Sequence, residues 1–281
     1  MATKIEWTAR PGTTGETWNP VTGCTKISEG CKHCYAERMA KRLAGRFGYP
    51  ADDPFRVTLH GDNLDRPLHW HKPRTVFVCS MGDLFHEDVP PAYRTDIFDM
   101  MSYANTIHHT FLVLTKRPEQ INVWENWVGE RWRGDSAWSI SRDCYNAWPP
   151  NIWLGVTAEN QEQADKRIPV LLQIPAAVHF VSIEPMLGPV IIDHWLGDAY
   201  SSCHGGFDSG LDWVIVGGET GPRARRMDCN WALDVVEQCQ GAEVPVFVKH
   251  LGTANLLSDY SGADMSEWPE VLRVRQWPAL L

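Results

Sequence analysis

The chain has 281 residues, a length that suits either two average domains or a single α/β barrel. Hydrophobic residues make up 43% of the sequence and charged residues 22%, and no apolar run approaches the ~20 residues that span a bilayer, so membrane-spanning, collagen-like and wholly disordered classes are excluded. With 26 Lys and Arg against 35 Asp and Glu, the net charge of −9 disfavours bulk electrostatic capture of nucleic acid.

The first twelve residues, MATKIEWTARPG, lack the apolar segment of a secretory signal. We therefore expect a cytoplasmic protein without a membrane partner. Its eight cysteines are then expected to be thiols suited to metal or redox chemistry rather than disulfides.

Seven apolar, β-branched stretches with polar or Gly/Pro-marked ends predict parallel strands buried on both faces. In chain order they are residues 55–59, 75–79, 110–114, 152–156, 178–183, 213–216 and 244–248. Crossover helices are predicted at 92–104, 160–173 and 230–240. We therefore expect a single α/β domain over residues 1–281, a TIM-type β/α barrel of parallel strands, complete or partial, with insertions at 122–150 and 193–212.

Polar, charged or glycine residues follow six of these strands. They are Ser80, Gly82 and Asp83; Lys116 and Arg117; Glu159; Glu184; Gly217, Gly218 and Glu219; and Lys249 with His250. Because the carboxyl ends of parallel strands meet on one face, these side chains are expected to line one ligand site. The alternative is that they are ordinary polar turns.

Three cysteines lie on one glycine-containing loop: Cys24, Cys31 and Cys34, separated by six and two residues and followed by a predicted helix at 36–43. Three thiolates can hold three corners of a 4Fe-4S cluster and leave one iron open. The alternative is zinc, with a histidine such as His33 or His60 completing a tetrahedron. The second C-x-x-C hook typical of structural zinc sites does not occur in the sequence.

The loop at 19–43 also carries a resemblance. Its motifs Asn-Pro-x-x-Gly-Cys (19–24) and Cys-x-x-Cys-Tyr-Ala-x-Arg (31–38) resemble the cluster loop of radical S-adenosylmethionine enzymes, especially the branch similar to spore photoproduct lyase. That superfamily usually has three residues between its first two cysteines, against six here. Residues 75–85 and 114–118 are similar to the second and third strands of that branch and their exits.

Over nearly its full length the chain resembles a phage- and prophage-associated family of uncharacterised three-cysteine proteins. The shared motifs are Thr-Trp-Asn-Pro (17–20), Gly-Val-Thr-Ala-Glu-Asn (155–160), Ser-Ile-Glu-Pro-Met-Leu-Gly (182–188) and Gly-Gly-Glu-Thr-Gly (217–221).

The resemblance to the radical enzymes implies a 4Fe-4S cluster on Cys24, Cys31 and Cys34, and S-adenosylmethionine on the open iron. An external electron donor would then drive formation of a 5′-deoxyadenosyl radical. The substrate class implied is a nucleotide or nucleic acid.

With that cofactor in the barrel mouth, the position of each residue at its strand exit indicates a role. Ser80, Gly82 and Asp83 would bind the methionyl ammonium; Lys116 and Arg117 a cofactor carboxylate or substrate phosphate; Glu159 and Glu184 cofactor hydroxyls or a proton; and Gly217, Gly218 and Glu219 ribose or substrate. Arg223, Arg225 and Arg226 with Lys249 form a basic group expected to dock an anionic substrate. The competing function is a non-catalytic zinc or iron-sulfur protein whose barrel mouth binds a partner protein or nucleic acid.

Overall fold

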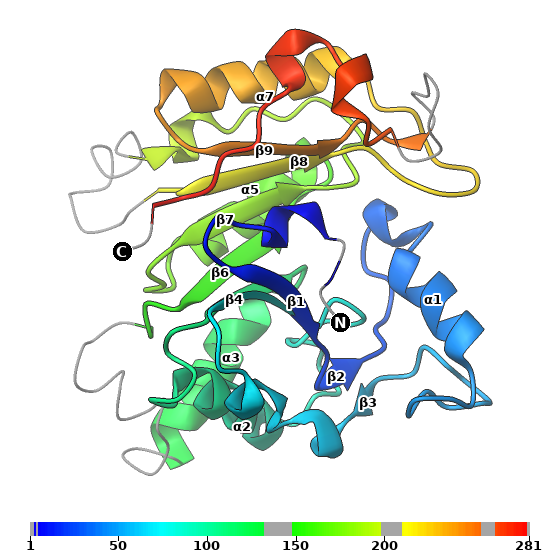
Figure 1. Ribbon diagram of the computed structural model, residues 1–281, viewed down its shortest axis with the longest axis vertical. Coiled ribbons are helices and arrows are strands. Elements are labelled where there is room, and N and C mark those ends of the chain that lie inside the picture. The colour runs from blue at the N-terminus through cyan, green and yellow to red at the C-terminus, as the bar shows by residue number, and fades with distance from the viewer. Residues whose placement is uncertain (1–2, 4, 132–147, 198–209, 254–261, 280–281) are drawn as a thin grey trace. The chain divides into compact units, whose positions relative to one another are not determined.

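The computed structural model describes residues 3, 5–131, 148–197, 210–253 and 262–279 (Figure 1). It divides into two compact units. The N-terminal unit comprises Met1–Ile27, Cys34–Leu154 and Ile174–Ala177, and the C-terminal unit comprises Ser28–His33, Gly155–Gln173 and Val178–Leu281. The cysteine loop is therefore shared: Cys24 and Cys34 belong to the first unit and Cys31 to the second.

Seven strands form the main sheet in the order β1-β4-β5-β6-β7-β8-β9. They are β1 (Thr14–Trp18), β4 (Arg74–Val78), β5 (Thr110–Thr115), β6 (Ile152–Thr157), β7 (His179–Ile183), β8 (Trp213–Gly217) and β9 (Val246–His250). The pairs β1–β4, β4–β5, β7–β8 and β8–β9 are parallel. The parallel α/β fold is thus confirmed, and so are six of the seven expected strands. A TIM-type barrel, complete or partial, stays a prediction.

The strand expected at 55–59 does not belong to the main sheet. Only β3 (Thr58–Leu59) forms there, and it pairs antiparallel with β2 (Val21–Thr22) in a separate two-stranded sheet. The main-sheet strand that the pattern missed is β1, whose sequence TGETW contains Gly15 and a charged Glu16. Glu16 is buried there because Arg66 and Arg74 pair with its carboxylate at 3.3 and 2.9 Å.

Helices of the N-terminal unit are α1 (Tyr35–Leu43), α2 (Pro91–Ser102) and α3 (Glu119–Arg131). The first two confirm the helices expected at 36–43 and 92–104. Where α2 packs on α3, the Phe98 ring lies 4.4 Å from Trp124 and 5.0 Å from Trp148, centroid to centroid. These contacts place the described ends of the segment expected to be an insertion at 122–150 in the core, while 132–147, including Cys144, lie outside the described residues.

Helices of the C-terminal unit are α5 (Gln161–Leu171) and α7 (Cys229–Gly241), close to the predicted ranges. Short 3-10 helices complete both units: η1 (Glu6–Thr8), η2 (Glu29–Cys31), η3 (Gly61–Asn63), η4 (Arg66–His69), η5 (Asp193–Trp195), η7 (Met265–Glu267) and η8 (Glu270–Leu272). Of the segment expected to be an insertion at 193–212, residues 198–209 with Cys203 lie outside the description. Among the described helices, none combines the length and apolar character needed to cross a bilayer.

Candidate functional site

Close backbone packing fixes the position of Cys24 in the N-terminal unit. The amide of Gly23 donates to Met81 O (2.9 Å), and the amide of Cys24 donates to Phe55 O (3.1 Å). A Cβ at Gly82 would stand 2.8 Å from Gly23 O, so the exit of β4 can lie against this loop only with glycine at 82. Gly82 was predicted to allow close approach of a cofactor, and here it allows close approach of the cysteine loop itself.

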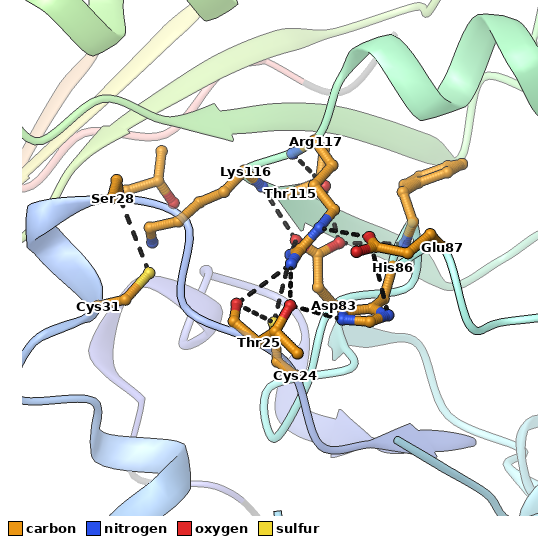
Figure 2. Close-up of polar contacts among 12 residues, drawn as sticks. Cys24, Thr25, Ser28, Cys31, Asp83, His86, Glu87, Thr115, Lys116 and Arg117 are labelled. Carbon is orange, nitrogen blue, oxygen red and sulfur yellow. Dashed lines mark hydrogen bonds and ion pairs between the residues drawn. The ribbon is translucent and has the colours of Figure 1, made fainter. Parts of the chain in front are cut away.

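The Asp83 carboxylate ties together the exits of β4 and β5 (Figure 2). Its Oδ1 accepts from Thr115 Oγ1 at 2.7 Å and Phe85 N at 3.0 Å, and its Oδ2 accepts from Lys116 N at 3.1 Å. The side chain is 5% exposed. Thr115 was not among the predicted site residues, although it directly precedes Lys116 at the same exit.

The Arg117 guanidinium uses all three of its nitrogen atoms within the N-terminal unit. Nε donates to Glu87 at 3.1 Å, Nη2 donates to Thr25 Oγ1 at 2.8 Å and to Thr25 O at 3.1 Å, and Nη1 lies 3.4 Å from Asp83 Oδ2 and 3.3 Å from Cys24 Sγ. The predicted contact of Arg117 with a cofactor or substrate anion would compete with these bonds.

Lys116 differs from its neighbour. Its side chain is partly exposed and points away from the guanidinium of Arg117 (Figure 2). Within the part of the chain that the structure describes, no carboxylate lies within ion-pair distance of its Nζ. Of the two cations predicted at this exit, Lys116 is the one suited to an external carboxylate or phosphate.

Ser80 and Cys34 also lie in this unit. Ser80 Oγ donates to the Asn19 side-chain oxygen at 3.1 Å, within the Asn-Pro motif that precedes Cys24. Cys34 is the N-cap residue of α1 and packs against the small apolar cluster of Ala36, Ala40, Tyr49 and Met81. Both residues are therefore anchored close to the ends of the cysteine loop.

Glu159, at the exit of β6, holds the Cys31 segment within the C-terminal unit. Its carboxylate is fully buried, pairs with Arg167 Nη1 at 2.8 Å and accepts from Gly30 N at 3.2 Å. A Cβ at Gly30 would meet this carboxylate at 2.9 Å, so glycine permits the contact. Arg167 is the buried cation that neutralises Glu159. In the sequence, only its position on the helix after β6 could have indicated this role.

Glu219, after β8, holds the same segment from a second side. Its Oε2 lies 2.9 Å from His33 Nδ1, and Arg225 pairs with its Oε1 at 2.6 Å. Arg225 also pairs with Glu29 at 3.2 Å. Burial alone would raise the pKa of Glu219, but hydrogen bonds from Arg225 and His33 bring it down to about 2. Arg225 was predicted to dock an anionic substrate, and here its charge is used inside the unit.

Glu184 forms a separate group at the exits of β7 and β9. Its Oε1 accepts from Lys249 Nζ at 2.6 Å and lies 3.1 Å from His250 Nε2. Burial would raise the Glu184 pKa, yet Lys249 and His250 hold it well below its usual range. Gly217 borders this group, because a Cβ there would lie 3.3 Å from both Glu184 and His250, and Gly218 lies against the Leu251 backbone.

Five of the six described cysteines fall into two kinds, and the sixth, Cys229, is partly buried, which raises the pKa of its thiol. Burial raises the pKa of the Cys79 and Cys239 thiols to about 12, which keeps them protonated and poor as metal ligands. Cys24, Cys31 and Cys34 are partly exposed, and Ser28 Oγ lies 3.7 Å from Cys31 Sγ.

The donor chemistry of these three thiols fits an iron-sulfur cluster, whose irons are held by cysteine thiolates, four of them in an ordinary 4Fe-4S cluster. A single metal ion, like a cluster, is bound by His, Cys, Asp or Glu side chains that lie close together. Among the residues that the structure covers, no three His, Cys, Asp or Glu side chains form such a group.

One comparison with known proteins gives a match. The family model described as "Protein of unknown function (DUF5131)" matches residues 2–268, which is nearly the whole chain. The searches of curated proteins and of solved structures found no match.

The carboxylate of Glu219 generates a pH prediction. Because its folded-state pKa of about 2 lies below the value of about 4.3 in an unfolded chain, the ionised group stabilises the fold at neutral pH, and this contribution is lost as pH falls from about 4.3 through 2. Glu219→Gln should therefore be less stable than wild type at pH 7, and the gap should narrow on acidification. Urea unfolding of both proteins at each pH measures this difference in the free energy of unfolding.

The exposed Glu162 on α5 provides the control, because Glu162→Gln removes a carboxylate from the same unit without touching the Cys31 segment. A Glu219→Gln deficit that stays constant between pH 7 and pH 2 would show that the charge of Glu219 does not stabilise this unit.

Proposed function

The chain belongs to the DUF5131 family of proteins of unknown function, and from the resemblance of its cysteine loop to that of the radical S-adenosylmethionine enzymes we propose that it is an enzyme of this kind, which binds a 4Fe-4S cluster through Cys24, Cys31 and Cys34. A bound and reduced cluster would supply the one electron needed to break the C5′–S bond of S-adenosylmethionine, which gives methionine and a 5′-deoxyadenosyl radical. Its electron comes from an external donor.

The observation that carries the proposal is the cysteine loop itself. Three partly exposed thiols lie within eleven residues, and buried charged groups hold the segments that bear two of them. Holding a loop in one conformation costs conformational entropy, and a surface loop that binds no ligand has no binding energy to offset that cost. A set of metal ligands that folding has already ordered binds its metal more tightly, because binding then requires no further ordering of the loop.

Other residues of the chain serve this function by binding and by positioning. Lys116 offers its ammonium group to a carboxylate of the cofactor or a phosphate of the substrate. Glu184, held ionised by Lys249 and His250, is suited to bind a hydroxyl, whereas its lowered pKa makes it a weak acceptor for the proton that the sequence also assigned to it. Glu159 and Glu219 act in this proposal through the segment 28–33 that they hold. A nucleotide or nucleic-acid substrate and a phage origin rest on the family resemblance alone.

Cluster loading depends on each of the three cysteines if this assignment holds. We expect Cys24→Ala, Cys31→Ala and Cys34→Ala each to lose most of the iron bound after anaerobic reconstitution, because two thiolates leave two irons without protein ligands. Iron and sulfide content, together with the broad absorption near ~400 nm, measure the loss.

Cys229→Ala is the matched control, since this thiol is partly buried at the start of α7 and belongs to no proposed ligand set. It should keep the iron content of wild type. A colourless wild-type protein with one zinc, or a Cys31→Ala protein that keeps its iron, would contradict the proposal and favour a non-catalytic metalloprotein.

Lys116 generates a second prediction. A hydrogen bond to a charged group contributes about 1.5–3 kcal/mol, so Lys116→Ala should weaken binding of S-adenosylmethionine to the loaded protein by roughly tenfold to hundredfold. Equilibrium dialysis of the oxidised, cluster-loaded protein measures this without turnover. Lys72→Ala, at an exposed lysine before β4, should bind like wild type. Equal affinity in the Lys116→Ala protein would remove Lys116 from the cofactor site.

A further inference from the structure

Arg117 was predicted to bind a ligand, but its contacts in the structure indicate a different role. The side chain is 3% exposed, and each of its three nitrogen atoms donates to a group of the N-terminal unit. Glu87 and Asp83 supply the compensating negative charge. An external anion would have to displace these bonds, so the guanidinium is committed to the protein itself.

The two ends of the guanidinium fork hold two consecutive residues of the cysteine loop. Nη1 contacts the sulfur of Cys24, and Nη2 donates to both the carbonyl and the hydroxyl of Thr25. Since the guanidinium is planar and rigid, these bonds fix the Cys24 sulfur relative to the Thr25 backbone. Lysine, with a single flexible ammonium, cannot make the same pair of contacts.

A histidine completes the hold on Thr25. His86 Nε2 lies 2.9 Å from Thr25 Oγ1, and His86 Nδ1 accepts from the Asp88 amide at 3.1 Å. With Nδ1 as acceptor, the neutral ring carries its proton on Nε2 and donates to the hydroxyl. Burial and the nearby Arg117 charge both lower the pKa of His86, in keeping with a neutral ring. Thr25 is thus held from two directions.

The same contact places the positive charge of Arg117 next to the Cys24 sulfur. The guanidinium that contacts Cys24 Sγ stays charged at every practical pH, because arginine does not lose its proton in proteins. A hydrogen bond from a cation to a thiolate withdraws electron density from it. Hydrogen bonds to the ligating sulfurs are among the features that set the potential of an iron-sulfur cluster.

We propose that Arg117 is a positioning residue that aims the Cys24 sulfur at the cluster and raises the reduction potential of that cluster through its Nη1–sulfur contact. The inference rests on the cluster site proposed above and deepens it. It makes Arg117 a fixed part of the metal site rather than a ligand of cofactor or substrate.

Reduction potentials of the reconstituted protein test the electronic part. Arg117→Gln, which keeps hydrogen-bonding capacity but loses the charge, should shift the cluster midpoint to a more negative value, and Arg117→Lys should fall between it and wild type. Arg74→Gln is the matched control: Arg74 lies in the same unit at the start of β4 and pairs with Glu16 at 2.9 Å rather than with the cysteine loop. Its potential should equal that of wild type. An Arg117→Gln protein with full iron and an unchanged potential would overturn the proposal.

Hydrogen–deuterium exchange of the metal-free protein tests the positioning part and does not depend on the cluster. The Cys24 amide, bonded to Phe55 O, should exchange roughly tenfold faster or more in Arg117→Gln, since a charged hydrogen bond contributes at least that factor to local opening. Arg74→Gln should leave the exchange rate of this amide unchanged.

The two measurements separate the two ideas. Wild-type protein that binds no iron contradicts the proposed function, while faster exchange at Cys24 in Arg117→Gln would still support the positioning role. Unchanged exchange at Cys24 in both Arg117→Gln and Arg117→Lys overturns that role, whatever metal the protein holds.

Discussion

Buried carboxylates at the ends of strands must be neutralised, and this requirement organises the candidate site. Removing one partner of a buried ion pair typically costs about 3–5 kcal/mol, so each acid at a strand exit needs a cation in a fixed place. In the N-terminal unit Arg117 meets Asp83, and in the C-terminal unit Arg225 meets Glu219. Each arginine also donates to the cysteine loop, Arg117 to Cys24 and Thr25, and Arg225 to Glu29.

Most of the main sheet follows from residue patterns alone. The stretches that became β5 to β8 are apolar and β-branched, and nearly every residue in them is buried, so burial on both faces leaves an unmistakable pattern. β1 lacks that pattern because it contains the charged residue Glu16. Glu16 can be buried there because Arg66 and Arg74, which are distant in sequence, neutralise it. Residues 55–59 carried the pattern, yet most of them support the Cys24 loop rather than the main sheet.

The residues of the candidate site were found more readily than their partners. Spacing and residue type single out the three cysteines and the polar strand exits, because these features are local. Which groups pair is not local: Glu219 reaches Arg225 and His33, one near and one far in sequence, and Glu159 reaches Gly30. A carboxylate that looks available to a ligand in the sequence can therefore be occupied in the fold, and Lys116 stands out only once those pairings are known.

The central claim is that three thiolates leave one iron open to S-adenosylmethionine. Electron paramagnetic resonance of the reduced, reconstituted protein, recorded with cofactor carrying nitrogen-15 in its amino group, tests this directly. The account predicts a nitrogen-15 hyperfine coupling to the cluster that is replaced by a nitrogen-14 coupling with unlabelled cofactor and is absent without cofactor. A cluster signal that shows no such coupling at saturating cofactor would contradict the account.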